Sequence, residues 1–86
     1  MRGEQVRQEI DLRGMRVDEI EIEVDRALDE AVLEDLGQLR IIHGKGTGAV
    51  RARVQELLRR DRRVRSFRLG HPAEGGSGVT VAELKR

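Results

Sequence analysis

The 86-residue sequence has no cysteine, no tryptophan, no tyrosine and a single phenylalanine. Without cysteine it can form neither a disulfide framework nor a thiolate metal site. No apolar run approaches the roughly 18 residues of a membrane helix, and the first residues lack the apolar core of a signal peptide. We therefore expect a cytoplasmic protein that makes no contact with a membrane. Because single-strand binders and base readers usually stack bases on aromatic rings, we expect any nucleic acid to be bound through its backbone.

Charged side chains make up 38% of the sequence and are distributed unevenly. Residues 1–43 contain six basic and twelve acidic side chains, a net charge of −6, whereas residues 44–70 contain nine and two, a net charge of +7. A concentrated basic segment is typical of proteins that bind nucleic acid. The alternative is a solvated surface whose arginines only aid solubility. If the segment binds nucleic acid, Arg51, Arg59 and Arg60 are candidate phosphate contacts.

Residues 41–48 read Ile-Ile-His-Gly-Lys-Gly-Thr-Gly, the layout of a strand that ends in a glycine-rich turn and leads into a helix. Glycines let the backbone approach an anion closely, and a helix N-terminus offers unpaired N–H groups. We therefore expect Lys45 and the backbone of Gly44, Gly46, Thr47 and Gly48 to hold a phosphate. The alternative is a tight turn without a ligand. The stretch does not match the Walker A pattern, so ATP or GTP hydrolysis is not expected.

The hydrophobic spacing along the chain predicts the element order βαβαββ. Strands are expected at residues 8–12, 39–43, 64–69 and 79–84, helices at 17–36 and 47–60, and a loop at 70–78. Gly37 is the expected stop of the first helix, and Thr47 is the expected N-cap of the second. We expect residues 1–7 to be disordered and residues 8–86 to form one domain.

Right-handed crossovers would place both helices on one face of a mixed sheet, which predicts an α/β fold of the two-layer α+β sandwich type. The first three strands would run parallel and the fourth antiparallel. Their turns would then meet at one edge of the sheet, the edge where open α/β sheets bind ligands. Gly76 and Gly78, in the last loop, would flank the same cleft or else form a plain hairpin loop.

Three motifs in this order resemble the Smr (small MutS-related) domain: residues 11–14 (Asp-Leu-Arg-Gly), residues 43–48, and residues 75–81. The resemblance covers about residues 10–84 and is closest to the Smr domains that end bacterial MutS paralogues. It implies four mixed strands with two helices on one side, similar to the C-terminal domain of a bacterial translation initiation factor. It also implies endonuclease activity within a larger MutS-like ATPase chain, linked to recombination suppression, DNA repair or, in some bacteria, ribosome rescue.

On the basis of this resemblance, Asp11, Arg13 and His43 are the catalytic candidates, and we expect Arg13 and His43 to face one pocket at this edge of the sheet. His43 could act as general acid or base because its unperturbed pKa lies near neutrality, or it could be a strand-end histidine bonded to the backbone. Asp11 could orient His43, bind a metal or activate water, or it could simply pair with Arg13. Arg13 could grip a phosphate and offset transition-state charge, or form a surface ion pair.

One position departs from the family pattern, because many members carry histidine where this chain has Arg13. The arginine removes the histidine of an Asp-x-His proton relay suited to RNA and leaves DNA nicking open. We therefore favour a DNA-nicking endonuclease domain, acting on branched or duplex DNA with little sequence preference. The alternatives are an RNA-cleaving domain and a non-catalytic module that docks on nucleic acid or the ribosome. No metal-ligand spacing is recognisable, and only a loosely held Mg²⁺ is left open.

If the basic segment binds a phosphate backbone, replacing Arg59 and Arg60 together by alanine weakens binding and flattens its salt dependence. Each phosphate contact contributes about 0.9 to the slope of log affinity against log salt on duplex DNA. Fluorescence anisotropy with a labelled duplex at several salt concentrations measures that slope. An unaltered slope in the double variant contradicts the assignment.

Overall fold

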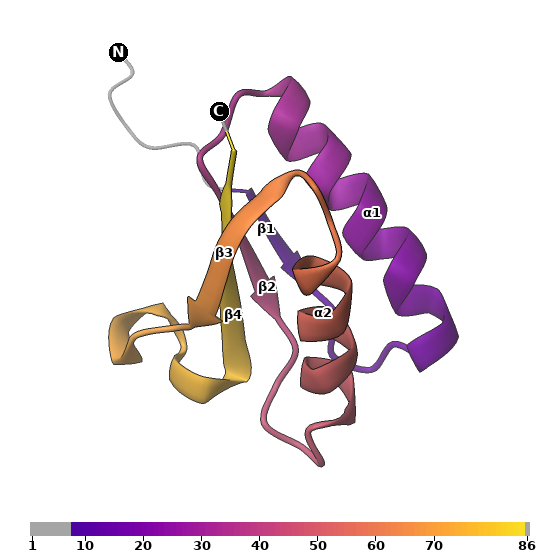
Figure 1. Cartoon of the computed structure of the whole chain (residues 1–86). Coiled ribbons are helices and arrows are strands. Elements are labelled where there is room, and N and C mark those ends of the chain that lie inside the picture. The colour runs from indigo at the N-terminus through magenta and orange to yellow at the C-terminus, as the bar shows by residue number, and fades with distance from the viewer. Residues whose placement is uncertain (1–7, 86) are drawn as a thin grey trace.

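The computed structural model describes residues 8–85 as two layers, with both helices on one face of a four-stranded sheet (Figure 1). The elements are β1 (Gln8–Asp11), α1 (Val17–Leu33), β2 (Gln38–Ile42), α2 (Ala49–Arg59), β3 (Val64–Leu69), the 3₁₀ turns η1 (Pro72–Glu74) and η2 (Gly76–Gly78), and β4 (Val79–Leu84). The order confirms the predicted βαβαββ arrangement. The disorder predicted for residues 1–7 lies outside the described residues. Within the described part, no helix has the length and apolar character needed to cross a membrane.

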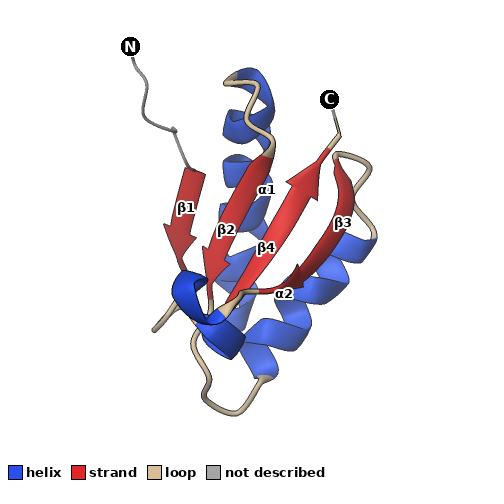
Figure 2. Cartoon of the chain, turned by 90° about the vertical axis from the view of Figure 1, so that its left-hand side faces the viewer, coloured by secondary structure: helices blue, strands red, loops and turns tan. Residues whose placement is uncertain are grey.

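The strand order across the sheet is β1-β2-β4-β3. β1 and β2 pair in parallel, and β4 runs antiparallel to both of its neighbours, as predicted. The sequence pattern did not predict that β4 would lie between β2 and β3. Figure 2 shows this order from the uncovered face of the sheet, with the short helical segment before β4 at the edge where β1 and β2 end.

The core lies between the helices and the sheet. α1 buries one stripe at the predicted helical spacing, and each of its members is at most 3% exposed: Ile20, Val24, Ala27, Leu28 and Ala31. α2 adds Val54 and Leu58, and the covered face of the sheet adds residues such as Leu39 and Ile41. Full burial of such a side chain stabilises the fold by about 1.5–3 kcal/mol. Because side chains alternate along β2, residue 43 falls on the same covered side as residue 41.

α1 ends three residues earlier than predicted, at Leu33 rather than at the residue before Gly37. Asp35 adopts a left-handed conformation with φ of 58°, the conformation that usually follows a helix C-cap. Its N–H donates to Val32 O at 3.0 Å, and the Leu36 N–H donates to Ala31 O at 2.9 Å, the two bonds of a Schellman motif. The backbone bonds around Asp35, rather than Gly37, terminate the helix.

The start of α2 also differs from the prediction. The N-cap is Gly48, with φ of 89°, rather than Thr47. Thr47 lies one residue before this N-cap. Its hydroxyl accepts the N–H of Ala49, the first residue of the helix, at 3.3 Å. The glycine is needed because the chain reverses in a left-handed conformation immediately before the helix begins.

The segment between β3 and β4 is more ordered than the loop that the sequence predicted. Arg68 and Glu74 join its two sides with hydrogen bonds of 2.8 and 3.2 Å. Gly75 follows with φ of 112°, and a Cβ placed there would lie only 2.5 Å from Val79 Cγ2. This glycine therefore allows the segment to pack against the start of β4.

Gly75→Ala should destabilise the domain by roughly 2–4 kcal/mol, because it combines backbone strain with a steric clash. Gly76→Ala is the matched control, since Gly76 has φ of 61° and no atom within 4 Å of a Cβ placed there. The control should cost only about 1 kcal/mol. Urea unfolding midpoints of both variants measure the difference, and equal losses would show that the Val79 contact is unimportant.

Candidate nucleic-acid site at the carboxyl edge of the sheet

The predicted glycine turns meet at one edge of the sheet. The His43 and Gly44 N–H groups both donate to Gly78 O, at 3.0 and 2.9 Å, which ties the end of β2 to the start of β4. On the other side of β2, the Leu12 N–H donates to Ile42 O at 2.8 Å. The loops that follow β1 and β2 and the loop that precedes β4 are therefore neighbours.

An open cavity of about 470 Å³ lies at this edge. Its lining residues come from every one of these loops and from β1, β2 and β4: Glu9, Arg13, Arg40, Ile42, Gly44, Lys45, Glu74, Gly75, Gly78 and Val79. Arg40 and Ile42 alternate along β2 with the buried Leu39 and Ile41, so the cavity opens on the sheet face that the helices leave uncovered.

Asp11 and Arg13 form a tight pair beside this cavity. The Arg13 backbone N–H and Nε both donate to Asp11 Oδ1 at 3.0 Å, and Nη2 donates to Oδ2 at 2.7 Å. Hydrogen bonds from Arg13 lower the pKa of Asp11 to about 2, so the carboxylate is ionised at neutral pH. The side chains remain 47% and 63% exposed. The guanidinium uses two of its five N–H donors on Asp11, and the others can reach a ligand.

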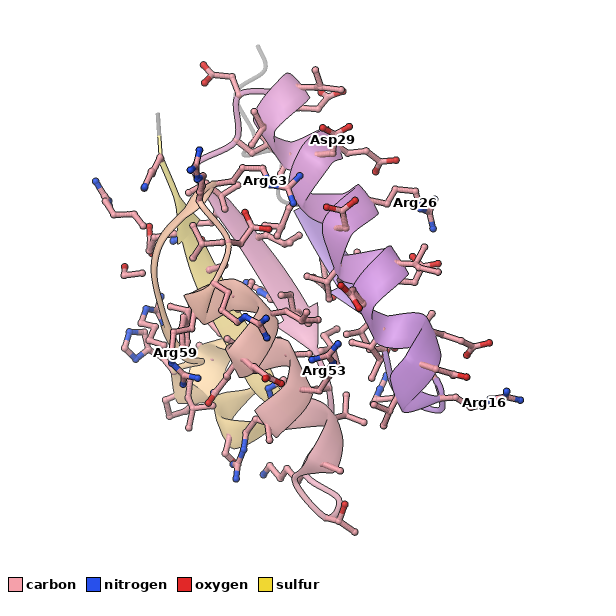
Figure 3. All side chains as sticks on the ribbon, turned by 45° about the vertical axis from the view of Figure 1, so that its right-hand side comes forward. Arg16, Arg26, Asp29, Arg53, Arg59 and Arg63 are labelled. Carbon is pink, nitrogen blue, oxygen red and sulfur yellow. The ribbon has the colours of Figure 1, made fainter. Side chains whose placement is uncertain are left out.

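The same local motif occurs a second time, at Asp61 and Arg63. The backbone N–H and Nε of Arg63 donate to Asp61 Oδ1 at 2.9 Å, and Nη2 donates to Oδ2 at 2.8 Å. Here Nη2 also donates to Asp25 on α1 at 2.7 Å, and Figure 3 shows Arg63 between α1 and the chain that leads into β3. One copy of the motif therefore joins two elements, whereas the copy at Asp11 and Arg13 stays open to solvent.

The turn after β2 presents backbone donors. The Gly44 N–H, which we expected to contact phosphate, is instead bonded to Gly78 O. The amides of the next four residues, Lys45 to Gly48, have no hydrogen-bond acceptor within residues 8–85. The Lys45 side chain crosses Gly78, with its Cγ 3.5 Å from the place of a Cβ on that glycine. An anion at this turn would meet unpaired N–H groups and a lysine.

His43 points away from the cavity, into the protein. It is 5% exposed, its Nδ1 lies 2.9 Å from Gly44 O, and its Nε2 lies 2.8 Å from Thr80 Oγ1. Because a carbonyl oxygen only accepts, Nδ1 carries the proton and the Thr80 hydroxyl donates to Nε2. Gln55 on α2 in turn donates to Thr80 Oγ1 at 3.4 Å. Burial lowers the pKa of His43; the bond to Gly44 O opposes this, and the charge of Arg51 reinforces it.

The expected convergence of Arg13 and His43 on one pocket is therefore wrong. Their loops adjoin, but Arg13 lines the cavity on the open face while the His43 ring lies on the helix-covered side. This is the strand-end histidine that the sequence analysis gave as the alternative. No local pattern points to Thr80 and Gln55, since their proximity to His43 depends on β4 pairing with β2.

The predicted phosphate contacts on α2 lie outside the cavity. Arg51 is exposed in the first turn of α2, Arg59 lies over the Phe67 ring at 5.6 Å from its centroid, and Arg60 pairs with Glu56 at 3.3 Å. None of them lines the cavity, and Gly76 does not line it either. Gly78 is buried in the lining.

The donor set at the cavity does not form a ready Mg²⁺ site. Among residues 8–85 no three histidine or carboxylate side chains gather as metal ligands. Each carboxylate at the cavity faces an arginine: Glu9 with Arg40 at 3.4 Å, Asp11 with Arg13 at 2.7 Å, and Glu74 with Arg68 at 2.8 Å. A metal would have to compete with a guanidinium for every one of these oxygens.

The family model described as "Smr domain" matches residues 10–85. The chain belongs to the Smr domain family. Its fold is similar to that of the crystallised Smr domain of Thermus thermophilus MutS2, with a TM-score of 0.88 and 54% identity over 92% of this chain and 99% of that one. It is also similar to YdaL, a stand-alone small MutS-related protein from Escherichia coli, with a TM-score of 0.86 and 27% identity over 91% of this chain and 64% of that one.

Longer relatives carry the name Endonuclease MutS2. This Smr domain is 64% identical to the Gemmatimonas aurantiaca protein over 76 residues, which is 88% of this chain and 9% of that protein. It is 56% identical to the Thermus thermophilus protein over 77 residues, which is 90% of this chain and 10% of that one. The chain thus spans about a tenth of the length of these relatives.

Because the pKa of His43 is lowered from 6.5 in the folded state, the unfolded chain binds that proton more readily. Neutral His43 should therefore contribute its full share to the free energy of unfolding above about pH 7. This contribution should be lost as the pH falls from 7 toward 5. The pKa values of Asp11 and Glu74, lowered to about 2, add losses only at lower pH, below their ordinary values of 3.8 and 4.5. Urea unfolding across this range measures the effect, and His43→Asn should abolish the decline between pH 7 and 5. An unchanged decline in that variant would assign it to other groups.

Proposed function

We propose that this Smr domain is a nucleic-acid endonuclease module that nicks branched or duplex DNA with little sequence preference. It would act as part of a larger MutS-like protein in recombination control or DNA repair. The observation that carries the proposal is the exposed Asp11–Arg13 pair at a cavity shared with Lys45 and adjoining a turn with unpaired amides. The names of the longer relatives support the same reaction class.

The bound phosphodiester would lie over the cavity. Lys45 and the unpaired turn amides would hold its non-bridging oxygens, and the unused donors of Arg13 would form a third contact. Such contacts recognise phosphate and sugar rather than base edges, which accounts for weak sequence preference. The cavity lining contains three cationic side chains, Arg13, Arg40 and Lys45, and two carboxylates, Glu9 and Glu74.

The same contacts suit the chemistry of hydrolysis. Water attacks phosphorus, a P–O bond forms, and the opposite P–O ester bond breaks to leave a nick, with the departing oxygen taking up a proton from solvent. Charge grows on the phosphate oxygens in the transition state, where Arg13 and Lys45 would stabilise it. A phosphate bound to the remaining donors of Arg13 shares the guanidinium charge with Asp11, so the pKa of Asp11 would rise from about 2 toward its ordinary value of 3.8. Asp11 is thereby better able to accept the proton of the attacking water.

His43 would position the turn rather than carry a proton in the reaction. Its Nδ1–H group holds Gly44 O, and its backbone N–H shares Gly78 O with Gly44. Together these bonds would fix the direction in which the following amides point. Because the residue is 5% exposed and both ring nitrogens are engaged, His43 would reach a phosphate only after the turn opens.

The runner-up function is a non-catalytic module that docks on nucleic acid or the ribosome, with RNA cleavage as a third candidate. The burial of His43 favours the docking module, because it removes the group best suited to acid–base work at neutral pH. Supercoiled plasmid and structured RNA, each with Mg²⁺ and with EDTA, separate the three candidates through the products that form.

Arg13→Ala should slow plasmid nicking by about 100-fold or more while weakening DNA binding less than tenfold, because a transition-state contact is worth about 2.7–4 kcal/mol. Arg63→Ala is the matched control, since it removes the second copy of the same motif. The control should lower the unfolding midpoint and leave nicking by the folded domain unchanged. Equal losses of binding and nicking in Arg13→Ala would make Arg13 a binding residue only.

His43→Asn keeps a donor near the place of Nδ1–H, whereas His43→Ala removes it. If His43 positions the turn, the asparagine variant should retain most of the nicking rate and the alanine variant should lose at least tenfold. The pH profile of nicking should keep its shape in the asparagine variant. Equal inactivation of both variants, with a lost inflection near neutral pH, would instead assign His43 as the general acid or base.

A further inference from the structure

α2 has two sides that differ in how their arginines are paired. Toward α1, Arg53 binds Glu21 at 3.2 Å and Glu56 at 2.9 Å. On the other side, Arg51 and Arg59 have no carboxylate partner within the described part of the chain. Figure 3 shows Arg53 directed toward α1 and Arg59 on the opposite side of the helix. Only the second side offers uncompensated positive charge.

The unpaired arginines share a helix face. Arg51, Gln55 and Arg59 follow one another at intervals of four residues, which stacks them along α2. Gln55 hydrogen-bonds Thr80, so this face adjoins the sheet near β4. From Arg51 to Arg59 the helix rises about 12 Å. One strand of a duplex advances by roughly the same length over three or four nucleotides.

Arg59 is held in place without an ion pair. Its guanidinium carbon lies 5.6 Å from the centroid of the Phe67 ring, a cation–π arrangement that orients the group. Stacking uses the face of the guanidinium, so the N–H donors at its edge stay available to phosphate oxygens. The same contact covers Phe67, the chain's only aromatic ring, and so prevents it from serving as a platform for a base.

Unpaired charge continues past the end of α2. Arg62 and Arg65 are both exposed, and neither has a carboxylate partner among residues 8–85. Arg65 lies where the pairing of β3 with β4 shifts register, between Val64 and Ser66. At the other end of the helix, Lys45 lines the cavity and also lacks an ion pair in the described region.

The other helix presents the opposite charge. α1 contains seven acidic residues and one basic residue, a net charge of −6 over Val17–Leu33. A phosphate backbone would be repelled from this side of the helical layer. The domain therefore favours one orientation, with α1 turned away from nucleic acid.

We propose that Arg51, Arg59, Arg62 and Arg65 form a track for the phosphodiester backbone of a duplex, leading from the cavity along the α1-distal side of α2 toward the start of β3. This track rests on the proposed function only for the identity of the ligand and does not depend on catalysis. The track would fix the direction in which the duplex crosses the domain. Arg59 would bind the duplex, whereas Arg53 and the side of α2 that faces α1 would not contact it.

Binding is measured by fluorescence anisotropy with a labelled duplex and a labelled single strand at several salt concentrations. R51Q/R59Q should lower the salt slope by about 2 and weaken duplex binding ten- to hundredfold near 0.1 M salt. The control R26Q/R53Q removes the same charge from arginines that are already paired, and it should change the slope by less than 0.5. R51K/R59K, which keeps the charge, should retain the slope of the parent domain.

The track is overturned if both glutamine variants lose the same affinity, or if R51Q/R59Q binds like the parent. The assignment to a duplex is overturned if the single strand binds the parent domain as tightly as the duplex does and if R51Q/R59Q weakens the binding of both to the same extent. Nicking at saturating DNA separates this proposal from the nuclease. If the parent fails to nick but R51Q/R59Q lowers the slope, the nuclease fails and the track stands. If Arg13→Ala abolishes nicking while R51Q/R59Q binds normally, the nuclease stands and the track fails.

Discussion

A single backbone oxygen joins the two strands at the edge of the sheet where the cavity lies. Gly78 O accepts the N–H groups of both His43 and Gly44, which joins the end of β2 to the start of β4. Leaving a buried amide unpaired costs about 1–3 kcal/mol, so the junction strongly favours one arrangement of the turn. His43 and Thr80 reinforce it on the helix-covered side, and the Lys45 stem crosses Gly78 at the cavity. The cavity and the unpaired amides keep their places because this junction is fixed.

Local geometry alone does not decide what an arginine does in this fold. The Asp-x-Arg motif is built twice with nearly the same hydrogen bonds, at Arg13 and at Arg63. Arg63 gains a third partner on α1 and becomes a joint between elements. Arg13 has no such partner in the described region and keeps donors for a ligand. On α2, Arg53 likewise binds Glu21 of α1, whereas Arg51 has no carboxylate partner in the described region. The contacts that each arginine makes elsewhere in the fold therefore determine how many of its donors stay available.

The sequence predicted the features that depend on neighbouring residues. The element order, the α1 stripe from Ile20 to Ala31, the glycine-rich turn and the limits of β3 and β4 follow from local spacing and are found as expected. Val17 has the same helical spacing but is 49% exposed, because it lies at the very start of α1. The direction of His43 was not predicted, because it depends on β4 reaching the side of β2 from 36 residues further along the chain (residues 43 and 79). The end of α1 was missed because an aspartate, not the nearby glycine, takes the left-handed position. The pairs that Arg53 and Arg63 form with Glu21 and Asp25 on α1 were not predicted, because they depend on how α1 packs against the rest of the chain.

The position of β4 in the sheet also determines when the strands can pair during synthesis. This strand is the last of the described elements in the chain, yet it occupies an inner position between β2 and β3. During synthesis β3 has no strand to pair with until residues 79–84 have left the ribosome, because β4 is its sole neighbour in the described sheet. Non-local pairing of this kind closes late, since the chain entropy of a long loop is lost before the contacts form. The edge at which the end of β2 meets the start of β4 therefore cannot form in a nascent chain until β4 is in place.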